Sequence, residues 1–197
     1  MPNAIAIIAF TLLFASGPAL AAAPPDPKQA EKSATALRQR AEKGDGNAAL
    51  QLGNLLVQNR VPAAKFGHAA DWYRKGCNLG DLSACHNIGY SYEAGKNGVA
   101  RDLLEAAAYY LKAAERAFLP SMVNLGALYA NGVIIADDVE GYKWLLIARL
   151  AANQCPGTPI CQSIIEDRNG HRARMKSRLS VSEQRLAESM AMDWKPK

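Results

Sequence analysis

Apolar and polar residues between residues 47 and 152 follow a pattern that repeats along the chain. Three short phrases mark the period, because their glycines stand 36 and then 37 residues apart: Gln51-Leu52-Gly53, Asn87-Ile88-Gly89 and Asn124-Leu125-Gly126. Six residues after each glycine comes a residue type that tolerates the left-handed conformation at a helix end, namely Asn59, Gly95 and Gly132. Such a period holds two helices of ordinary length and two short connectors. The pattern therefore predicts a short helical solenoid.

Each period is expected to contain one helix pair. The pairs are predicted at 47–58 and 67–79, at 82–95 and 102–117, and at 119–131 and 138–153. In the first helix of each pair, a glycine lets the neighbouring helix approach closely: Gly53, Gly89 and Gly126. In the second helix, an aromatic side chain fills the gap between one unit and the next: Trp72, Tyr109 and Trp144.

The ends of the chain lack a full period and are predicted to cap the stack. Ala30, Ala34, Leu37 and Ala41 recur at helical spacing, which indicates the second helix of a truncated first unit. Beyond Ala152 we expect a turn and then a helix from about Pro159 whose middle is weakened by Gly170. Residues 180–183 form a capping-box sequence that predicts a last helix running to about residue 194.

The repeated residues resemble those of the Sel-one-like repeats, a family related to the tetratricopeptide repeats. The best match is the run 124–133, Asn-Leu-Gly-Ala-Leu-Tyr-Ala-Asn-Gly-Val, and the middle unit matches nearly as well. The first unit departs from the family pattern, with Gln51 for Asn, Leu56 for Tyr and Arg60-Val61-Pro62 in place of a glycine turn. The resemblance covers about residues 34–153. It implies an all-α, right-handed superhelical solenoid of about three helix-turn-helix repeats plus capping helices, and it implies an interaction scaffold.

The first residues of the chain have the composition of a secretory signal peptide. Residues 1–25 carry no charged side chain, and Ala4 to Ala15 is almost continuously apolar. Ala19-Leu20-Ala21 follows as an expected cleavage site. We therefore predict a signal peptide at 1–21, a proline-rich leader at 22–33, the solenoid at 34–153 and capping helices at 154–197, with a retained amino-terminal anchor as the alternative. The expected location is the bacterial periplasm or the exterior of the cell.

Four cysteines, an even number, are expected to form disulfides in an exported chain. Cys77 and Cys85 stand on either side of a predicted turn, so a bond between them would staple two units together. Cys155 and Cys161 would close the turn before the tail helix. A secreted, cysteine-rich branch of the Sel-one-like family shows the Cys77–Cys85 spacing. A metal site at Cys77, Cys85 and His86 is the alternative, but the paired cysteines of zinc modules are missing. We expect no metal and no cofactor.

Catalysis is not expected from the residues. The resemblance to the cysteine-rich branch raises a β-lactam-directed or peptidoglycan-directed hydrolase or binder as an alternative. However, no serine has a lysine three positions later, which a serine β-lactam acceptor requires. The three histidines, His68, His86 and His171, are far apart in the sequence. The paired carboxylates at 137–138 and 166–167 are adjacent, and adjacent residues on a helix face different ways.

Two surfaces are candidates for binding. The first consists of side chains that repeat at one register on the first helices, which line the concave side of related stacks: Gln51, Asn54, Asn87, Tyr90, Asn124 and Ala127. Amide side chains suit the backbone of an extended peptide, although they could instead hold neighbouring helices together. The second is a basic run, in which the first, second and fourth members are expected on one helix face: Arg168, Arg172, Arg174, Lys176 and Arg178. It is either a solvated face or a site for an acidic envelope component.

The net charge of +5 is too modest to indicate nucleic-acid binding. The sequence predicts an exported, non-catalytic scaffold that binds another protein or an extended peptide. A structural or regulatory subunit of an envelope assembly is a further alternative.

Overall fold

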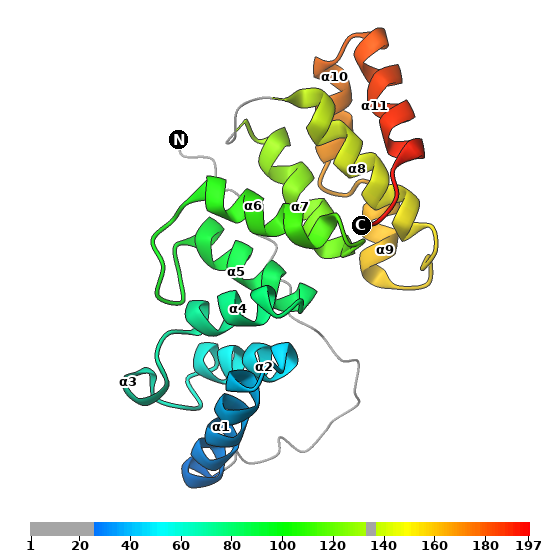
Figure 1. Cartoon of the computed structure of the whole chain (residues 1–197). Helices are drawn as coiled ribbons and strands as arrows, with labels where there is room; N and C mark the ends of the chain where they lie inside the picture. Colours follow the sequence, from blue (N-terminus) through cyan, green and yellow to red (C-terminus); the bar gives the residue numbers. More distant parts are fainter. Residues whose placement is uncertain (1–25, 133–136) are drawn as a thin grey trace.

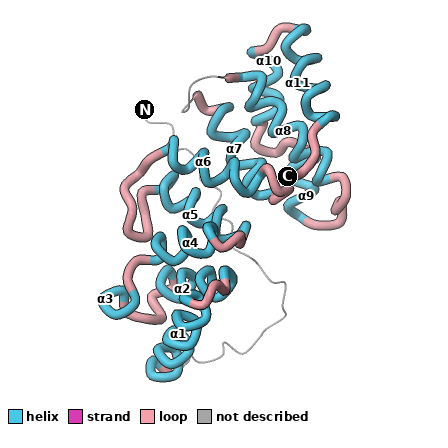
Figure 2. Tube along the Cα trace, viewed as in Figure 1, coloured by secondary structure: helices cyan, strands magenta, loops and turns pink. Residues whose placement is uncertain are grey.

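The computed structural model describes residues 26–132 and 137–197, so the predicted signal peptide lies outside the described residues. Within these ranges the protein is all-helical and contains no strand (Figure 2). The helices are α1 Pro27–Glu42, α2 Gly46–Val57, α3 Ala63–Phe66, α4 Ala69–Asn78, α5 Leu82–Ala94, α6 Leu103–Ala114, α7 Leu119–Ala130, α8 Asp138–Ala152, α9 Pro159–Ile165, α10 His171–Arg178 and α11 Val181–Asp193. The pairs α2/α4, α5/α6 and α7/α8 are stacked in chain order (Figure 1), which confirms the predicted solenoid.

Aspartates open most of the repeat helices, because their side chains accept hydrogen bonds from N–H groups that the first helical turn leaves free. Asp45 accepts from the N–H of Ala48 at 2.9 Å, and Asp81 accepts from the N–H of Ala84 at 2.8 Å. Asp102 and Asp137 cap α6 and α8 in the same way. These caps fix where four of the six repeat helices begin.

The core of each repeat is a contact between the motif glycine of the first helix and a large side chain of the second. A Cβ atom at Gly53 would lie 2.5 Å from the ring of Tyr73, and one at Gly89 would lie 2.8 Å from the ring of Tyr110. In the third repeat, Leu145 takes the place of the tyrosine opposite Gly126. The glycines therefore allow the close helix approach that the sequence predicts.

Three features differ from the sequence-based expectations. Helix α1 begins at Pro27, inside the segment 22–33 that was expected to be a leader, because proline fits the first turn of a helix. The loop after α2 contains the short helix α3, which buries Phe66. The single helix expected from Pro159 is two helices, α9 and α10, since Gly170 lies in the left-handed conformation with φ of 65°.

The capping elements lie at opposite ends of the stack (Figure 1), with α1 packed on α2 and α11 packed on α8. Helix α11 opens with the expected capping box at Ser180 and Glu183. The ring of Trp194 meets the ring of Trp144 edge-on, with centroids 6.0 Å apart. Among the helices in residues 26–132 and 137–197, none has the length and apolar character needed to cross a membrane.

Candidate interaction surfaces

The six side chains that repeat at one register, which we call the amide row, come from the first helices of the three repeats. Helix α2 carries Gln51 and Asn54, helix α5 carries Asn87 and Tyr90, and helix α7 carries Asn124 and Ala127. Gln51 is exposed and the other five are half-buried, so all six retain some contact with solvent. The amide row is thus distributed over three consecutive units of the stack.

Two of the amides in the row also join the first repeat to the second. The hydroxyl of Tyr73, which is only 3% exposed, donates to Oδ1 of Asn54 at 2.8 Å. Nδ2 of Asn87, in the next unit, donates to the same oxygen at 3.5 Å. Burial raises the pKa of Tyr73 to about 12, and the hydrogen bond with Asn87 opposes that shift. These contacts support the alternative in which the amides hold units together, while peptide binding by the row stays a prediction.

A comparable arrangement surrounds Tyr110 in the second repeat. This tyrosine is fully buried, and its hydroxyl donates to Oε2 of Glu93 at 2.6 Å. Burial and the neighbouring Glu93 carboxylate raise the pKa of Tyr110 far above its usual range, while a hydrogen bond with Asn124 opposes the shift. Nζ of Lys96 lies 5.9 Å from the ring centre of Tyr90. The structure therefore adds Glu93 and Lys96 to the surroundings of the row. The sequence signal for Glu93 is its position one turn after Tyr90.

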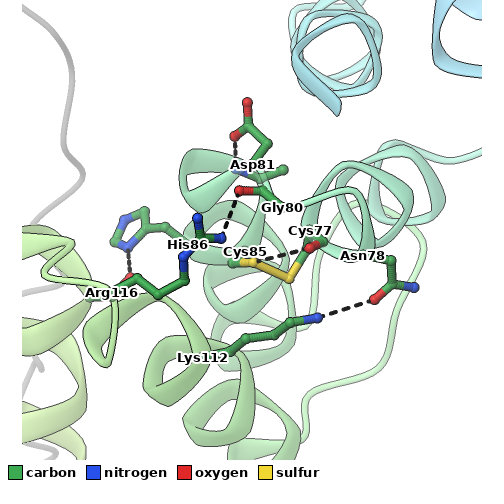
Figure 3. The surroundings of a disulfide bond; sticks show 10 residues. Cys77, Asn78, Gly80, Asp81, Cys85, His86, Lys112 and Arg116 are labelled. Atoms are coloured by element: carbon green, nitrogen blue, oxygen red, sulfur yellow. Dashed lines mark hydrogen bonds between the residues drawn. A yellow bond between two sulfur atoms is a disulfide. The ribbon is translucent and has the colours of Figure 1, made fainter. Parts of the chain in front are cut away.

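The structure contains both disulfides that the sequence predicts. Cys77 is bonded to Cys85, and Cys155 is bonded to Cys161. Figure 3 shows that the first bond lies beside the turn between α4 and α5. Two cations of the second repeat reach the same turn. Nζ of Lys112, on α6, donates to Oδ1 of Asn78 at 3.4 Å, and Arg116, just after α6, donates to the carbonyl of Gly80 at 3.1 Å. The turn is therefore held by a covalent bond and by the following repeat.

His86, the histidine of the alternative metal site, is packed into the junction between the second and third repeats. Its Nδ1 lies 3.1 Å from Oγ of Ser121 on α7. Its ring centroid is 5.4 Å from that of Tyr110 and 5.7 Å from that of Phe118. Burial lowers the pKa of His86 to about 4, so the ring is neutral at pH 7. In the described part of the chain, no group of three or more His, Cys, Asp or Glu residues is arranged to hold a metal ion.

The basic run does not form one helix face. Because α9 ends at Ile165 and α10 begins at His171, the expectation that Arg168 shares a face with Arg172 and Lys176 is wrong. Arg168 pairs with Glu166 at 2.6 Å, and the Arg172 guanidinium donates to the carbonyls of Ile164 and Ile165 at the end of α9.

The remaining cations of the run point toward the third repeat or into solvent. Arg174 donates to the Asn131 side chain at 2.8 Å, and Arg178 donates to the carbonyl of Ala130 at 3.0 Å. Lys176 is exposed. Two of the five cations, Arg172 and Arg178, therefore bind backbone carbonyls at helix ends, where positive charge is stabilising.

The recurring aromatic residues of the second helices occupy similar positions with different partners. Nε1 of Trp72 donates to the carbonyl of Phe66 at 2.6 Å, and Nε1 of Trp144 donates to Oε1 of Glu140 at 2.9 Å. Tyr109 stacks on Tyr92, with ring centroids 5.8 Å apart. These side chains contribute to the core rather than to an open surface.

Comparison with protein families identifies the repeat. The family model described as "Sel1 repeat" matches residues 47–81, 82–118 and 119–153, which together are more than half of the chain. The chain belongs to the Sel1 repeat family. The three matched segments coincide with the pairs α2/α4, α5/α6 and α7/α8. Sel1 repeats generally serve as scaffolds for protein–protein interaction.

Two solved structures share this fold. One is a protective antigen present in uropathogenic Escherichia coli strains, described as displaying an SLR fold, with a TM-score of 0.66 and 25% identity over 83% of this chain. The other is a Sel1 repeat protein from Oxalobacter formigenes, with a TM-score of 0.58 and 25% identity over 83% of this chain. This chain spans 32% of the antigen and 64% of the Oxalobacter protein. A search of curated proteins finds no match to the chain.

Proposed function

We propose that this Sel1 repeat protein is an exported, non-catalytic scaffold of the bacterial envelope that binds a protein or an extended peptide along the amide row. The observation that carries the proposal is the continuous stack of three Sel1 repeats, whose first helices present side chains at one register. An amide side chain can donate to a peptide carbonyl and accept from a peptide N–H, so a row of amides suits the backbone of an extended peptide.

The two disulfides support export. Structural disulfides persist in oxidising compartments such as the periplasm and are rare in the cytosol. Both cysteine pairs of the chain are bonded, and no cysteine is free. This agrees with the signal peptide predicted at residues 1–21.

Site-specific photocrosslinking tests binding along the row. A photoreactive amino acid replaces Gln51, which is exposed on α2, and a control protein carries it at Ala36, which is exposed on α1. After irradiation in the native host, we expect a discrete adduct from position 51 that excess unlabelled protein displaces, and none from position 36. Equal adducts at both positions, or none at position 51, would contradict the proposal. Fractionation of the same cells tests the envelope location, because cytosolic recovery of the full chain would contradict export.

A chromogenic β-lactam tests the non-catalytic part of the proposal. We expect no hydrolysis above the buffer rate by the purified, oxidised protein. Ser163 of α9 and His171 of α10 line one cavity. Turnover that co-purifies with the protein and falls when either residue is replaced would instead support the hydrolase alternative.

A further inference from the structure

A small cavity lies where the turn between α9 and α10 covers the third repeat. Its volume is about 40 Å³, and its apolar floor includes Val123 of α7 and Leu145 of α8. Its polar lining comes from the turn and the helices beside it, and includes Arg168, Asn169 and His171. Arg168 and Asn169 are exposed, so the polar side of the cavity faces solvent. The cavity has room for more than one water-sized group, because about 10–15 Å³ of such volume holds one water molecule.

One polar atom in this lining lacks a partner. Nδ1 of His171 is buried and makes no hydrogen bond to any of the residues that the structure describes. A buried polar atom without a partner retains its full cost of desolvation, so such an atom indicates an interaction with water, an ion or a ligand. The ring nitrogen can provide one hydrogen bond to a group in the cavity.

The charged neighbours of His171 are already engaged in other ways. The two carboxylate oxygens of Asp167 accept the N–H groups of Arg172 at 3.1 Å and Ala173 at 2.9 Å. The Arg172 guanidinium binds the carbonyls that end α9. Asp167 therefore caps the start of α10, and the structure shows no hydrogen bond between its carboxylate and the ring nitrogen.

The lining carries two cations. Arg168 and Arg172 line the cavity, and Asp167 is the one carboxylate among its lining residues in the described part of the chain. Arg168 also pairs with the exposed Glu166 at 2.6 Å, so an anion in the cavity would have to share this guanidinium. Burial and the positive charge of Arg174 lower the pKa of His171, whereas Asp167 opposes that shift. A bound anion would reverse part of this effect by stabilising the protonated imidazole, and the protonated Nδ1 would donate to it.

The cavity and the end of the amide row both belong to the third repeat. Val123 in the cavity lining and Asn124 in the row are neighbours on α7, where adjacent residues face different ways. We propose that this cavity binds a carboxylate of the partner peptide, with His171 as the hydrogen-bond donor and Arg168 as the neighbouring cation. This inference rests on the proposed function for its partner, but the pocket itself can be tested alone.

The pocket can be tested by histidine NMR on the full, oxidised chain. Sodium acetate is titrated at constant ionic strength against sodium chloride, and the pKa of each histidine ring is followed. We expect acetate to raise the pKa of His171 by at least about half a unit, saturably and below 1 M. His86, buried at the junction of the second and third repeats, should not respond. The absence of a saturable change at His171, or an equal change with chloride, would overturn the proposal.

Two further arms identify the source of the carboxylate and the role of the cation. An alanine tripeptide with a free carboxyl terminus is compared with its amide and with an amidated tripeptide carrying a central Asp. Binding of the free-acid alanine tripeptide alone indicates that the pocket takes a peptide terminus. Binding of the Asp-containing peptide indicates that it takes an acidic side chain. If the alanine tripeptide amide binds as well as either carboxylate peptide, the carboxylate assignment is overturned.

Arg168→Gln is expected to weaken acetate binding about three- to tenfold, while Arg185→Gln, an exposed matched change on α11, should leave it unaltered. Equal acetate affinity of the two variants would show that Arg168 does not contribute to the site. If acetate binds but position 51 gives no crosslink, the peptide scaffold is refuted and the carboxylate pocket is not. If position 51 gives a crosslink but acetate does not bind, the carboxylate pocket is refuted and the scaffold is not.

Discussion

The junction between the first and second repeats and the junction between the second and third share one design but are secured by different chemistry. At both, a buried tyrosine packs on a motif glycine, and an asparagine of the next unit lies close enough to oppose the rise in its pKa. The first junction adds the Cys77–Cys85 bond. The corresponding residues of the second junction are Ala114 and Met122, both fully buried. There the polar contact is between His86 and Ser121.

This difference implies that the two junctions respond to different conditions. The disulfide constrains the unfolded chain and is insensitive to pH over the range in which proteins are usually stable. A neutral histidine packed between two repeats is insensitive to reductant. The free energy of unfolding falls in acid, because the unfolded chain takes up a proton that the folded ring does not. The first junction should therefore be sensitive to reduction and the second to acid.

The largest effect is expected from acidification. The pKa of His86 is lowered from 6.5 to about 4, so its contribution to stability is complete above pH 6.5 and is lost as the pH falls toward 4. One unit of pKa shift corresponds to about 1.4 kcal/mol. Relative to pH 7, the free energy of unfolding should therefore fall by about 2 kcal/mol at pH 5 and about 3 kcal/mol at pH 4. His86→Phe retains the ring and removes the titration. Urea unfolding of both proteins at pH 7, 6 and 5 measures the difference, and parallel pH profiles would refute this role for His86.

An effect of similar size is expected from removing the covalent staple. Replacing Cys77 and Cys85 with serine should lower the free energy of unfolding by about 2–3 kcal/mol, because the closed loop is short. The loss should be the same at pH 7 and pH 5. Replacing Cys155 and Cys161 provides the matched control, since that bond closes a turn outside the repeats. A strongly pH-dependent loss in the first variant would contradict the separation of the two junctions.

The same comparison can be sharpened by moving the staple. Ala114→Cys combined with Met122→Cys places cysteines at the same separation in the second junction. Comparing the oxidised with the reduced form of this variant isolates the staple from the lost methionine packing. We expect the oxidised form to be about 2–3 kcal/mol more stable. Failure of the bond to form, detected by mass spectrometry, would show that the two junctions are not superimposable.

Intermediate effects are expected at the motif glycines. Gly89→Ala should cost about 1–3 kcal/mol, because the added Cβ lies 2.8 Å from the Tyr110 ring and 3.2 Å from a backbone carbonyl. Gly126→Ala should cost less, since Leu145 can change rotamer more readily than a hydrogen-bonded tyrosine. Thermal unfolding of the two variants gives the order, and a larger loss at Gly126 would contradict it.

The smallest effect is expected at an exposed ion pair that also reaches the second junction. Nζ of Lys197 lies 2.5 Å from Oε1 of Glu115, and the Lys197 N–H donates to the Glu115 carbonyl at 2.8 Å. Because the lysine side chain is 73% exposed, Lys197→Ala should cost less than about 1 kcal/mol. The loss should shrink further in high salt. A loss that salt does not change would point to packing rather than charge.

Sequence reasoning succeeded where the signal is local. The recurring glycines and the regular helix starts predicted the helix pairs, and the spacing across one turn predicted the Cys77–Cys85 bond. It failed to show where the helix expected from Pro159 breaks. The break at Gly170 could not be read from composition, because an isolated glycine is tolerated within many helices. The break is supported by Asp167, whose carboxylate caps α10 only in the folded geometry.

The sequence by itself determined the period, the all-helical repeats and the pairing of the cysteines, because glycine conformation, helix capping and short loop closure involve neighbouring residues. Only the tertiary structure decided what the polar residues do. Asn54 meets Tyr73 across 19 residues and Asn87 across 33, and Arg178 reaches the carbonyl of Ala130 across 48. Such partners come from other helices, so the stacking of the helices selects which amides and cations are engaged and which remain available to a ligand.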